Sequence, residues 1–141
     1  SNYSKPKHQS IHNKIYWNYG DYIGVGPGAH GRITNSHGRF ATQNYSNPEK
    51  WLSHAHESSG ENLRTHISKA DQAEEMVIMG LRLNSGISKT RYQTLSGKNF
   101  NERNLTNLIN DDLVLVDRGY IKATQNGKAV LNSLILNLLL N

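Results

Sequence analysis

Apolar side chains recur at helical intervals in the second half of the chain, but not in its first half. From Ser68 onward they return every three or four residues, which places them on one face of a helix. The first such stripe consists of Ala73, Met76, Val77, Gly80, Leu81 and Leu83. We therefore expect helices over residues 68–83, 88–96, 101–110 and 124–139.

A β-hairpin is predicted within this helical part. Two short runs rich in β-branched residues, 113–116 and 120–123, flank the turn Asp117-Arg118-Gly119. Three helices, a hairpin and a final helix are the elements of a winged-helix-like domain. The hairpin therefore makes a winged-helix-like domain a more specific prediction than a helical domain.

The first half contains shorter elements separated by turn residues. Ser10 is placed to cap a short helix, and Gly20 to end it. Ser58-Ser59-Gly60 separates this part from the helical part, so we expect one domain over residues 1–60 and another over 61–141. The expected elements are the end of a strand and a loop in residues 1–9, a helix over 11–18, a buried strand over 21–25, strands over 32–35 and 39–44, and a helix over 47–58.

Composition excludes several classes of function. The net charge is +5, but Lys and Arg are scattered without a run of three, which disfavours a surface that follows a phosphate backbone. The chain has no cysteine, so a disulfide, a thiolate nucleophile and a cysteine-held iron–sulfur cluster are all excluded within it. It begins Ser-Asn, carries no signal-peptide pattern, and has no apolar run long enough to span a bilayer. These features favour an excised piece of a longer cytoplasmic protein.

A glycine-rich loop follows the strand expected over residues 21–25. Its glycines, in Gly24-Val25-Gly26-Pro27-Gly28, permit a turn that side chains would block. The spacing is not that of the dinucleotide-binding GxGxxG motif. A classical phosphate-binding loop is therefore disfavoured, and a turn without a ligand remains open.

Four stretches together resemble a known family. They are SNYSKP at the start, SIHNKIYW, DYIGVGPGAHG, and AEEMVIMGLRL with its helical tail. In this order and spacing they resemble the C-terminal part of the oxygen-independent coproporphyrinogen III oxidase family, which are radical S-adenosylmethionine proteins. The HNxxYW pattern at His12, Asn13, Tyr16 and Trp17 is similar to the haem-chaperone branch rather than to the oxidases proper.

This resemblance implies an α+β fold. Residues 1–60 would be the last strands of an incomplete (β/α) radical-SAM barrel, and residues 61–141 the helical, winged-helix-like domain that covers it. The family binds a [4Fe-4S] cluster through CxxxCxxC and S-adenosylmethionine beside it, mostly in the N-terminal half of the barrel. Without cysteines the chain alone has no radical chemistry, so we expect neither a catalytic residue nor a metal ligand in it.

The resemblance also suggests cofactor-binding residues. The glycine loop would approach S-adenosylmethionine through Gly24, Gly26, Gly28, Ala29 and His30, with His30 as the side-chain contact.

For haem the residues are His12, Tyr16 and Trp17, because imidazole ligates haem iron and aromatic rings pack against porphyrins. The alternative is that His12 and Asn13 hydrogen-bond the barrel rim while Tyr16 and Trp17 fill a core. The remaining histidines are expected on the solvated surface; they are His8, His37, His54, His56 and His66.

The predicted function is that of a haem chaperone, which binds haem and hands it to acceptor haem proteins. The first alternative is the oxidase itself, which decarboxylates coproporphyrinogen III. The second is a nucleic-acid-binding winged-helix module, which we disfavour because the expected helix over 101–110 offers only Arg103 as a positive contact. The expected partners are the N-terminal half of the barrel, haem and acceptor proteins, with membrane contact only through acceptors. Uncovered strand edges and apolar faces also predict self-association.

Overall fold

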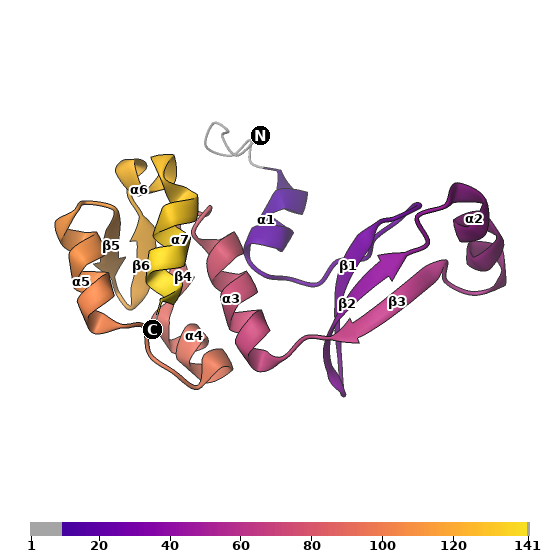
Figure 1. Ribbon diagram of the computed structural model, residues 1–141, viewed down its shortest axis with the longest axis horizontal. Helices are drawn as coiled ribbons and strands as arrows, with labels where there is room; N and C mark the ends of the chain where they lie inside the picture. The colour runs from indigo at the N-terminus through magenta and orange to yellow at the C-terminus, as the bar shows by residue number, and fades with distance from the viewer. Residues whose placement is uncertain (1–9, 141) are drawn as a thin grey trace. The chain divides into compact units, whose positions relative to one another are not determined.

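The computed structural model describes residues 10–140 (Figure 1). By their internal contacts these residues form two units, one of residues 20–68 and one of residues 10–19 together with 69–140. The elements are α1 (Ile11–Trp17), β1 (His30–Asn35), β2 (Gly38–Asn44), α2 (Pro48–Glu57), β3 (Glu61–His66), α3 (Lys69–Gly80), β4 (Ile87–Ser88), α4 (Lys89–Ser96), α5 (Glu102–Asn110), β5 (Val114–Asp117), β6 (Tyr120–Ala123), α6 (Gln125–Ala129) and α7 (Leu131–Leu139). This mixture confirms an α+β fold with two small antiparallel sheets. The strand end expected in residues 1–9 lies outside the described residues, and the division at residue 60 stays a prediction.

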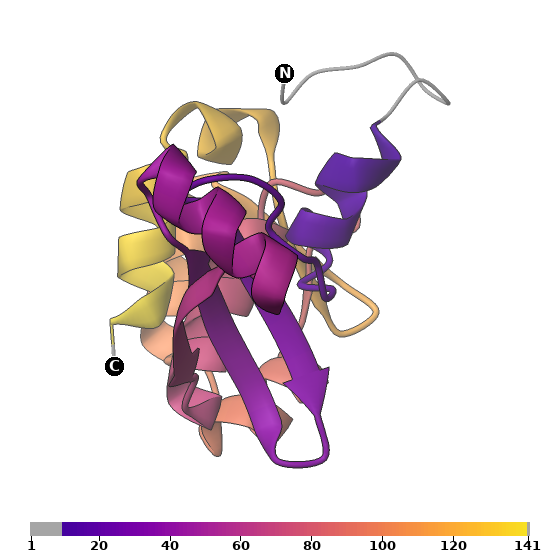
Figure 2. The same cartoon turned by 90° about the vertical axis from the view of Figure 1, so that its right-hand side faces the viewer.

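The unit of residues 20–68 is built on an antiparallel sheet in the order β1-β2-β3. Strand β1 begins two residues earlier than expected, and its pairing with β2 runs from His30 opposite Gln43 to Asn35 opposite Gly38. Helix α2 follows β2, and its start is as predicted, because the side chain of Asn47 accepts a hydrogen bond from the backbone N–H of Lys50 at 2.9 Å. In Figure 2 the sheet and α2 face the viewer.

Strand β3 was not expected, because residues after 60 were predicted to be helical. The six residues ENLRTH carry only one large apolar side chain, Leu63, so no apolar alternation marks them as a strand. Their structure comes instead from the ladder with β2, where Phe40 lies opposite His66 and Gln43 opposite Leu63. Tertiary pairing therefore determines this element, and sequence periodicity does not reveal it.

The buried strand expected over residues 21–25 is wrong. Only Tyr22 forms a bridge, exchanging two hydrogen bonds of 2.8 Å with Arg32. Ile23 and Val25, which were expected to be buried, are 76% and 84% exposed. The chain leaves the sheet after Tyr22 because it must turn back through the glycine loop to begin β1.

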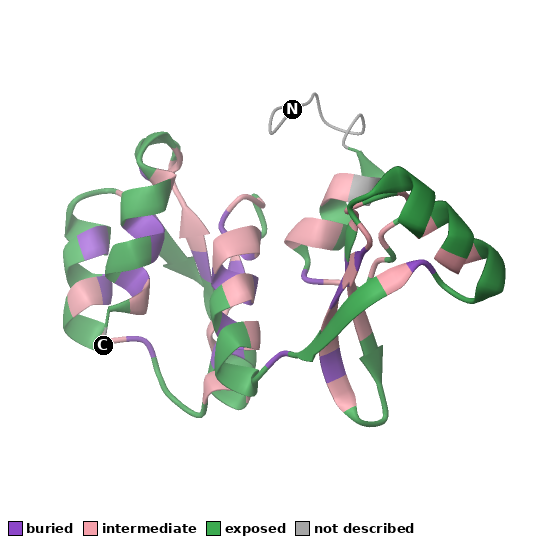
Figure 3. Ribbon diagram, turned by 45° about the vertical axis from the view of Figure 1, so that its right-hand side comes forward, coloured by how far each residue is buried: buried purple, intermediate pink, exposed green. Residues whose placement is uncertain are grey.

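The second unit has the larger apolar core. Its sheet has the order β4-β6-β5, and the buried side chains come from α3, α4, α5, α7 and this sheet (Figure 3). The predicted hairpin is confirmed, with Asp117 opposite Tyr120 and both turn residues, Arg118 and Gly119, at positive φ. The core residues buried to 2% exposure or less in this unit are Ala73, Val77, Leu81, Ile87, Val114, Ile121, Leu134 and Leu138.

The single helix expected over residues 124–139 is two helices. Helix α6 ends before Val130, whose φ of −117° and ψ of 33° depart from helical values, and α7 begins after it. Gly127 in α6 is buried, and a Cβ there would overlap the carbonyl oxygen of Leu113. Because the helix breaks at Val130, α6 can approach the Leu113 carbonyl closely while α7 buries its apolar face.

None of the helices within residues 10–140 combines the length and apolar character needed to cross a membrane.

Replacing Gly127 by Ala tests the close approach of α6. In an exposed helix Gly→Ala adds about 1 kcal/mol of stability, but here the new methyl group overlaps the Leu113 carbonyl. We therefore expect the free energy of unfolding to fall by roughly 1–3 kcal/mol, measured by urea denaturation. Gln125→Ala, an exposed position in the same helix, is the control, and a stabilised Gly127→Ala variant would contradict the packing described.

Candidate functional site

Helix α1 carries the HNxxYW residues. The Ser10 hydroxyl caps it by accepting from the backbone N–H of Asn13 at 3.3 Å, as predicted. His12 and Tyr16 are four residues apart and so share one face of the helix. Tyr16 and Trp17 are half-buried, while nothing is described of the His12 side chain.

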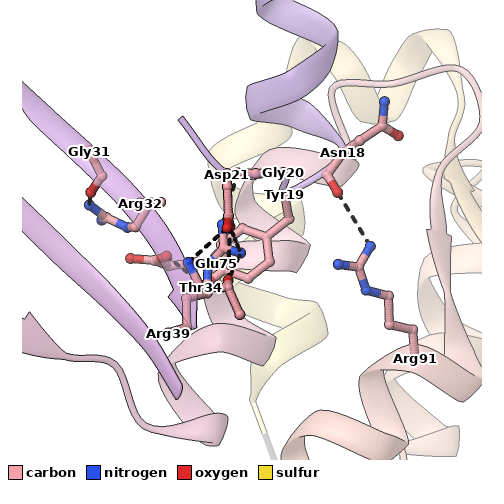
Figure 4. Close-up of polar contacts among 10 residues, drawn as sticks. All are labelled: Asn18, Tyr19, Gly20, Asp21, Gly31, Arg32, Thr34, Arg39, Glu75 and Arg91. Atoms are coloured by element: carbon pink, nitrogen blue, oxygen red, sulfur yellow. Dashed lines mark hydrogen bonds and ion pairs between the residues drawn. The ribbon is translucent and has the colours of Figure 1, made fainter. Parts of the chain in front are cut away.

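The end of α1 is fastened to its own unit by two contacts (Figure 4). Tyr19, only 5% exposed, donates its hydroxyl proton to Oε2 of Glu75 in α3 at 2.7 Å. It adopts a φ of 57°, which costs energy for a residue with a side chain. The guanidinium of Arg91 donates to the carbonyl of Asn18 at 3.3 Å.

Sequence reasoning did not find Tyr19. The only signal in the sequence was an aromatic residue directly before Gly20, at the end of a short helix. Burial of the ring and its hydrogen bond depend on α3, which lies fifty residues further along the chain.

In the unit of residues 20–68, an ion pair fixes the chain where it enters the glycine loop. Buried Arg39 donates to Oδ1 of Asp21 at 2.7 Å and to the carbonyl of Gly20 at 2.9 Å (Figure 4). The same carboxylate accepts from the backbone N–H and the hydroxyl of Thr34, at 2.7 and 2.9 Å. Residues 20 and 21 are thus tied to β1 and β2, and the sequence analysis missed this group as well.

The glycine loop itself is held by the side-chain amide of Asn44 at the end of β2. This side chain, 7% exposed, donates to the carbonyls of Gly24 and Gly26 at 3.1 and 3.0 Å. The backbone N–H of Asn44 donates to the carbonyl of Ala29 at 2.9 Å. Asn44 therefore holds both sides of the loop, through its side chain at Gly24 and Gly26 and through its backbone at Ala29.

Two kinds of constraint explain the glycines of the loop. A Cβ at Gly24 would lie 2.6 Å from the carbonyl oxygen of His30, closer than real structures allow. Gly26 and Gly28 have φ values of 102° and 69°, which L-residues rarely adopt. A Cβ at Gly26 would meet nothing within 4 Å, so the backbone there is open to an approaching molecule.

The residues of the loop do not obstruct the backbone contact with S-adenosylmethionine that the resemblance implies. The backbone at Gly26 is open, and His30, the first residue of β1, is exposed. The residues present do not fit an iron–sulfur cluster, because the chain has no cysteine. Within the described residues, no three His, Asp or Glu side chains converge as metal ligands would.

The structure assigns the predicted site residues to different units. His12, Tyr16 and Trp17 lie in the unit of residues 10–19 and 69–140, whereas Gly24, Gly26, Gly28, Ala29 and His30 lie in the unit of residues 20–68. Each group is ordered by contacts within its own unit. The predicted haem residues and the predicted S-adenosylmethionine residues are therefore two separate structural groups.

Replacing Asn44 by Asp tests how the loop is held. A carboxylate has no N–H to donate, and its charge would face the carbonyl oxygens of Gly24 and Gly26. We expect a loss of about 1–3 kcal/mol in the free energy of unfolding and faster exchange of the Gly28 amide, which donates to Tyr45 at 2.8 Å. Gln43→Glu makes the same chemical change one residue earlier and should alter neither; equal effects in both variants would refute the role of Asn44.

Comparison with known proteins gives one family. The family model described as the HemN C-terminal domain matches residues 67–130. Radical S-adenosyl methionine domain-containing protein 1, mitochondrial, of Bos taurus is 33% identical over 99% of this chain and 34% of its own length. The heme chaperone HemW of Buchnera aphidicola subsp. Acyrthosiphon pisum is 34% identical over 96% of this chain and 36% of its own length, and that of Escherichia coli is 29% identical over 96% and 35%.

A solved structure shares the fold. It is that of coproporphyrinogen III oxidase (HemN) from Escherichia coli, a radical SAM enzyme, with a TM-score of 0.59 and 19% identity over 84% of this chain and 28% of that one. The chain spans about a third of the length of the curated relatives it matches. Residues 67–130 therefore carry a HemN C-terminal domain, and the chain is similar over almost all of its length to part of the radical S-adenosylmethionine proteins and heme chaperones named above.

Proposed function

We propose that this protein is a haem chaperone and that the chain supplies one wall of its haem site. The observation that carries the proposal is α1, where the HNxxYW residues lie on a capped helix with Tyr16 and Trp17 half-buried rather than lost in the core. Relatives that share this length of sequence are named as heme chaperones. When bound, haem would be held by an imidazole at its iron and by aromatic side chains against its face.

In this proposal the chain completes a larger protein. Residues 1–60 belong to the end of the incomplete (β/α) barrel, and residues 61–141 to a winged-helix-like domain that closes it. The order α3, β4, α4, α5, β5, β6 supports the second assignment. The other partners are acceptor haem proteins, and exposed apolar side chains at Ile23, Val25 and Leu136 favour self-association where they remain uncovered.

The glycine loop would serve S-adenosylmethionine. Its backbone is ordered by Asn44 and open at Gly26, so a cofactor can approach it without displacing a side chain. The cofactor would supply the radical chemistry only with the [4Fe-4S] cluster, whose ligands this chain does not contain. The chain's own part would be to bind and position S-adenosylmethionine.

The oxidase and the nucleic-acid-binding module, the two alternative functions, would require different properties of the protein. The oxidase would convert coproporphyrinogen III, an activity that the assay below measures. A nucleic-acid module would use α5, but that helix begins with Glu102, and the nearby Lys89 ammonium lies 3.5 Å from its carboxylate. Helix α5 itself carries one positive side chain, Arg103, beside the negative Glu102, which does not favour phosphate contacts. The cytoplasmic setting stays a prediction; the relatives' names include mitochondrial proteins.

Haem titration of the full-length protein tests the proposed function. We expect saturable binding with a Soret band, and a shifted and weakened band in His12→Ala because the iron loses an imidazole ligand. His56→Ala, an exposed histidine in α2, is the control and should match the parent protein. Absence of saturable haem binding, together with turnover of coproporphyrinogen III, would reject the chaperone in favour of the oxidase; an unchanged band in His12→Ala would exclude His12.

Replacing Gly28 by Val tests the S-adenosylmethionine loop. The φ of 69° is strained for a β-branched residue, so the loop backbone should shift. We expect the affinity of the full-length protein for S-adenosylmethionine to fall at least about tenfold, a change of about 1.4 kcal/mol, by calorimetry. Gly97, at the end of α4, has a similar φ of 71°, so Gly97→Val introduces comparable strain away from the loop. The affinity of this control variant for S-adenosylmethionine should equal that of the parent protein. Equal affinity in Gly28→Val and the parent protein would overturn the assignment.

A further inference from the structure

A pocket of about 260 Å³ lies beside the end of α1, entirely within the unit of residues 10–19 and 69–140. Its apolar wall consists of Trp17, Met76, Leu83, Ile87 and Tyr120. Trp17 belongs to the HNxxYW pattern, and Tyr120 begins β6 of the hairpin. The pocket therefore adjoins the residues proposed for haem but is built mainly from the C-terminal domain.

One charged side chain lines this pocket. Arg91 in α4 is the only Lys, Arg, Asp or Glu among the residues that line it. Its guanidinium donates to the Asn18 carbonyl, and within residues 10–140 no carboxylate lies at ion-pair distance from it. A guanidinium has five N–H donors in a fixed fork that matches a carboxylate, so most of its donors remain available.

Hydroxyl groups lie next to this cation. Ser88 caps α4 by accepting from the backbone N–H of Arg91 at 3.2 Å, and its own O–H proton can still be donated. Ser85 also lines the pocket. The polar side of the pocket thus offers a cation and hydrogen-bond donors, which is what a carboxylate requires.

We propose that this pocket binds a carboxylate-bearing edge of the porphyrin, with Arg91 pairing a propionate and Trp17 packing against the ring. The proposal rests on the proposed haem function and extends it to residues that the HNxxYW pattern does not include. Pockets that enclose a whole drug-sized ligand measure about 300–1,000 Å³, so this smaller pocket suits one edge of a macrocycle. The rest of the ring would lie outside it, along α1.

Esterification of the ligand separates recognition of the carboxylate from binding in general. Haem and haem dimethyl ester are titrated into the full-length protein and into its Arg91→Met and Arg91→Lys variants. We expect the parent protein to bind haem about fivefold more tightly than the diester, as for a partly exposed charge pair. Arg91→Met should bind both equally, and Arg91→Lys should keep part of the preference because it keeps the charge.

The controls distinguish the possible failures. Arg103→Met removes an exposed positive charge from α5, away from the pocket lining, and should retain the full preference. If Arg91→Met only disturbed α1 through the lost bond to Asn18, haem and diester would weaken alike and their ratio would stay that of the parent protein; this result overturns the inference. Equal binding of haem and diester by the parent protein also overturns it, while leaving the proposed haem function intact. No saturable binding of haem at all rejects both.

Discussion

The placement of α1 depends on contacts made just beyond its last turn. A helix of seven residues is not stable in isolation, because nucleation costs more than so few hydrogen bonds return. The Tyr19–Glu75 hydrogen bond and burial of the tyrosine ring stabilise its end, although the φ of 57° at Tyr19 is itself unfavourable. Everything proposed for His12, Tyr16 and Trp17 follows from this anchor.

The glycine loop is ordered in the same manner, by a buried polar group rather than by apolar packing. The buried amide of Asn44 donates to the carbonyls of Gly24 and Gly26 and so joins two points of the loop to the end of β2. Ile23 and Val25 are exposed, so the loop does not depend on a core of its own. A loop with rigid backbone and exposed side chains is suited to contact another molecule without reorganising first.

Local signals in the sequence predicted the parts of the fold that local chemistry controls. Ser10, Asn47 and Ser88 cap helices where expected, and the Asp117-Arg118-Gly119 turn joins the predicted hairpin. Strand β3 was missed because its pairing partner, not its own sequence, makes it a strand. The strand over residues 21–25 was wrong for the opposite reason: its apolar residues suggested burial, but no neighbouring strand pairs with it beyond Tyr22. Tyr19, Arg39 and Asn44 could not be found because their partners are distant in sequence.

The discontinuity of the unit that contains α1 has a consequence for the order of folding. Its first segment ends at Tyr19 and its remainder starts at Lys69, so docking α1 closes a loop over residues 20–68. Closing this long loop costs conformational entropy, so the contact forms late. The sheet β1-β2-β3 and the hairpin β5-β6 instead pair segments that are close in sequence. We therefore expect α1 to be the last part of its unit to assemble and the first to detach. Under the proposed haem function, detachment of α1 ahead of the rest of its unit would open the proposed haem wall and so favour release of the ligand.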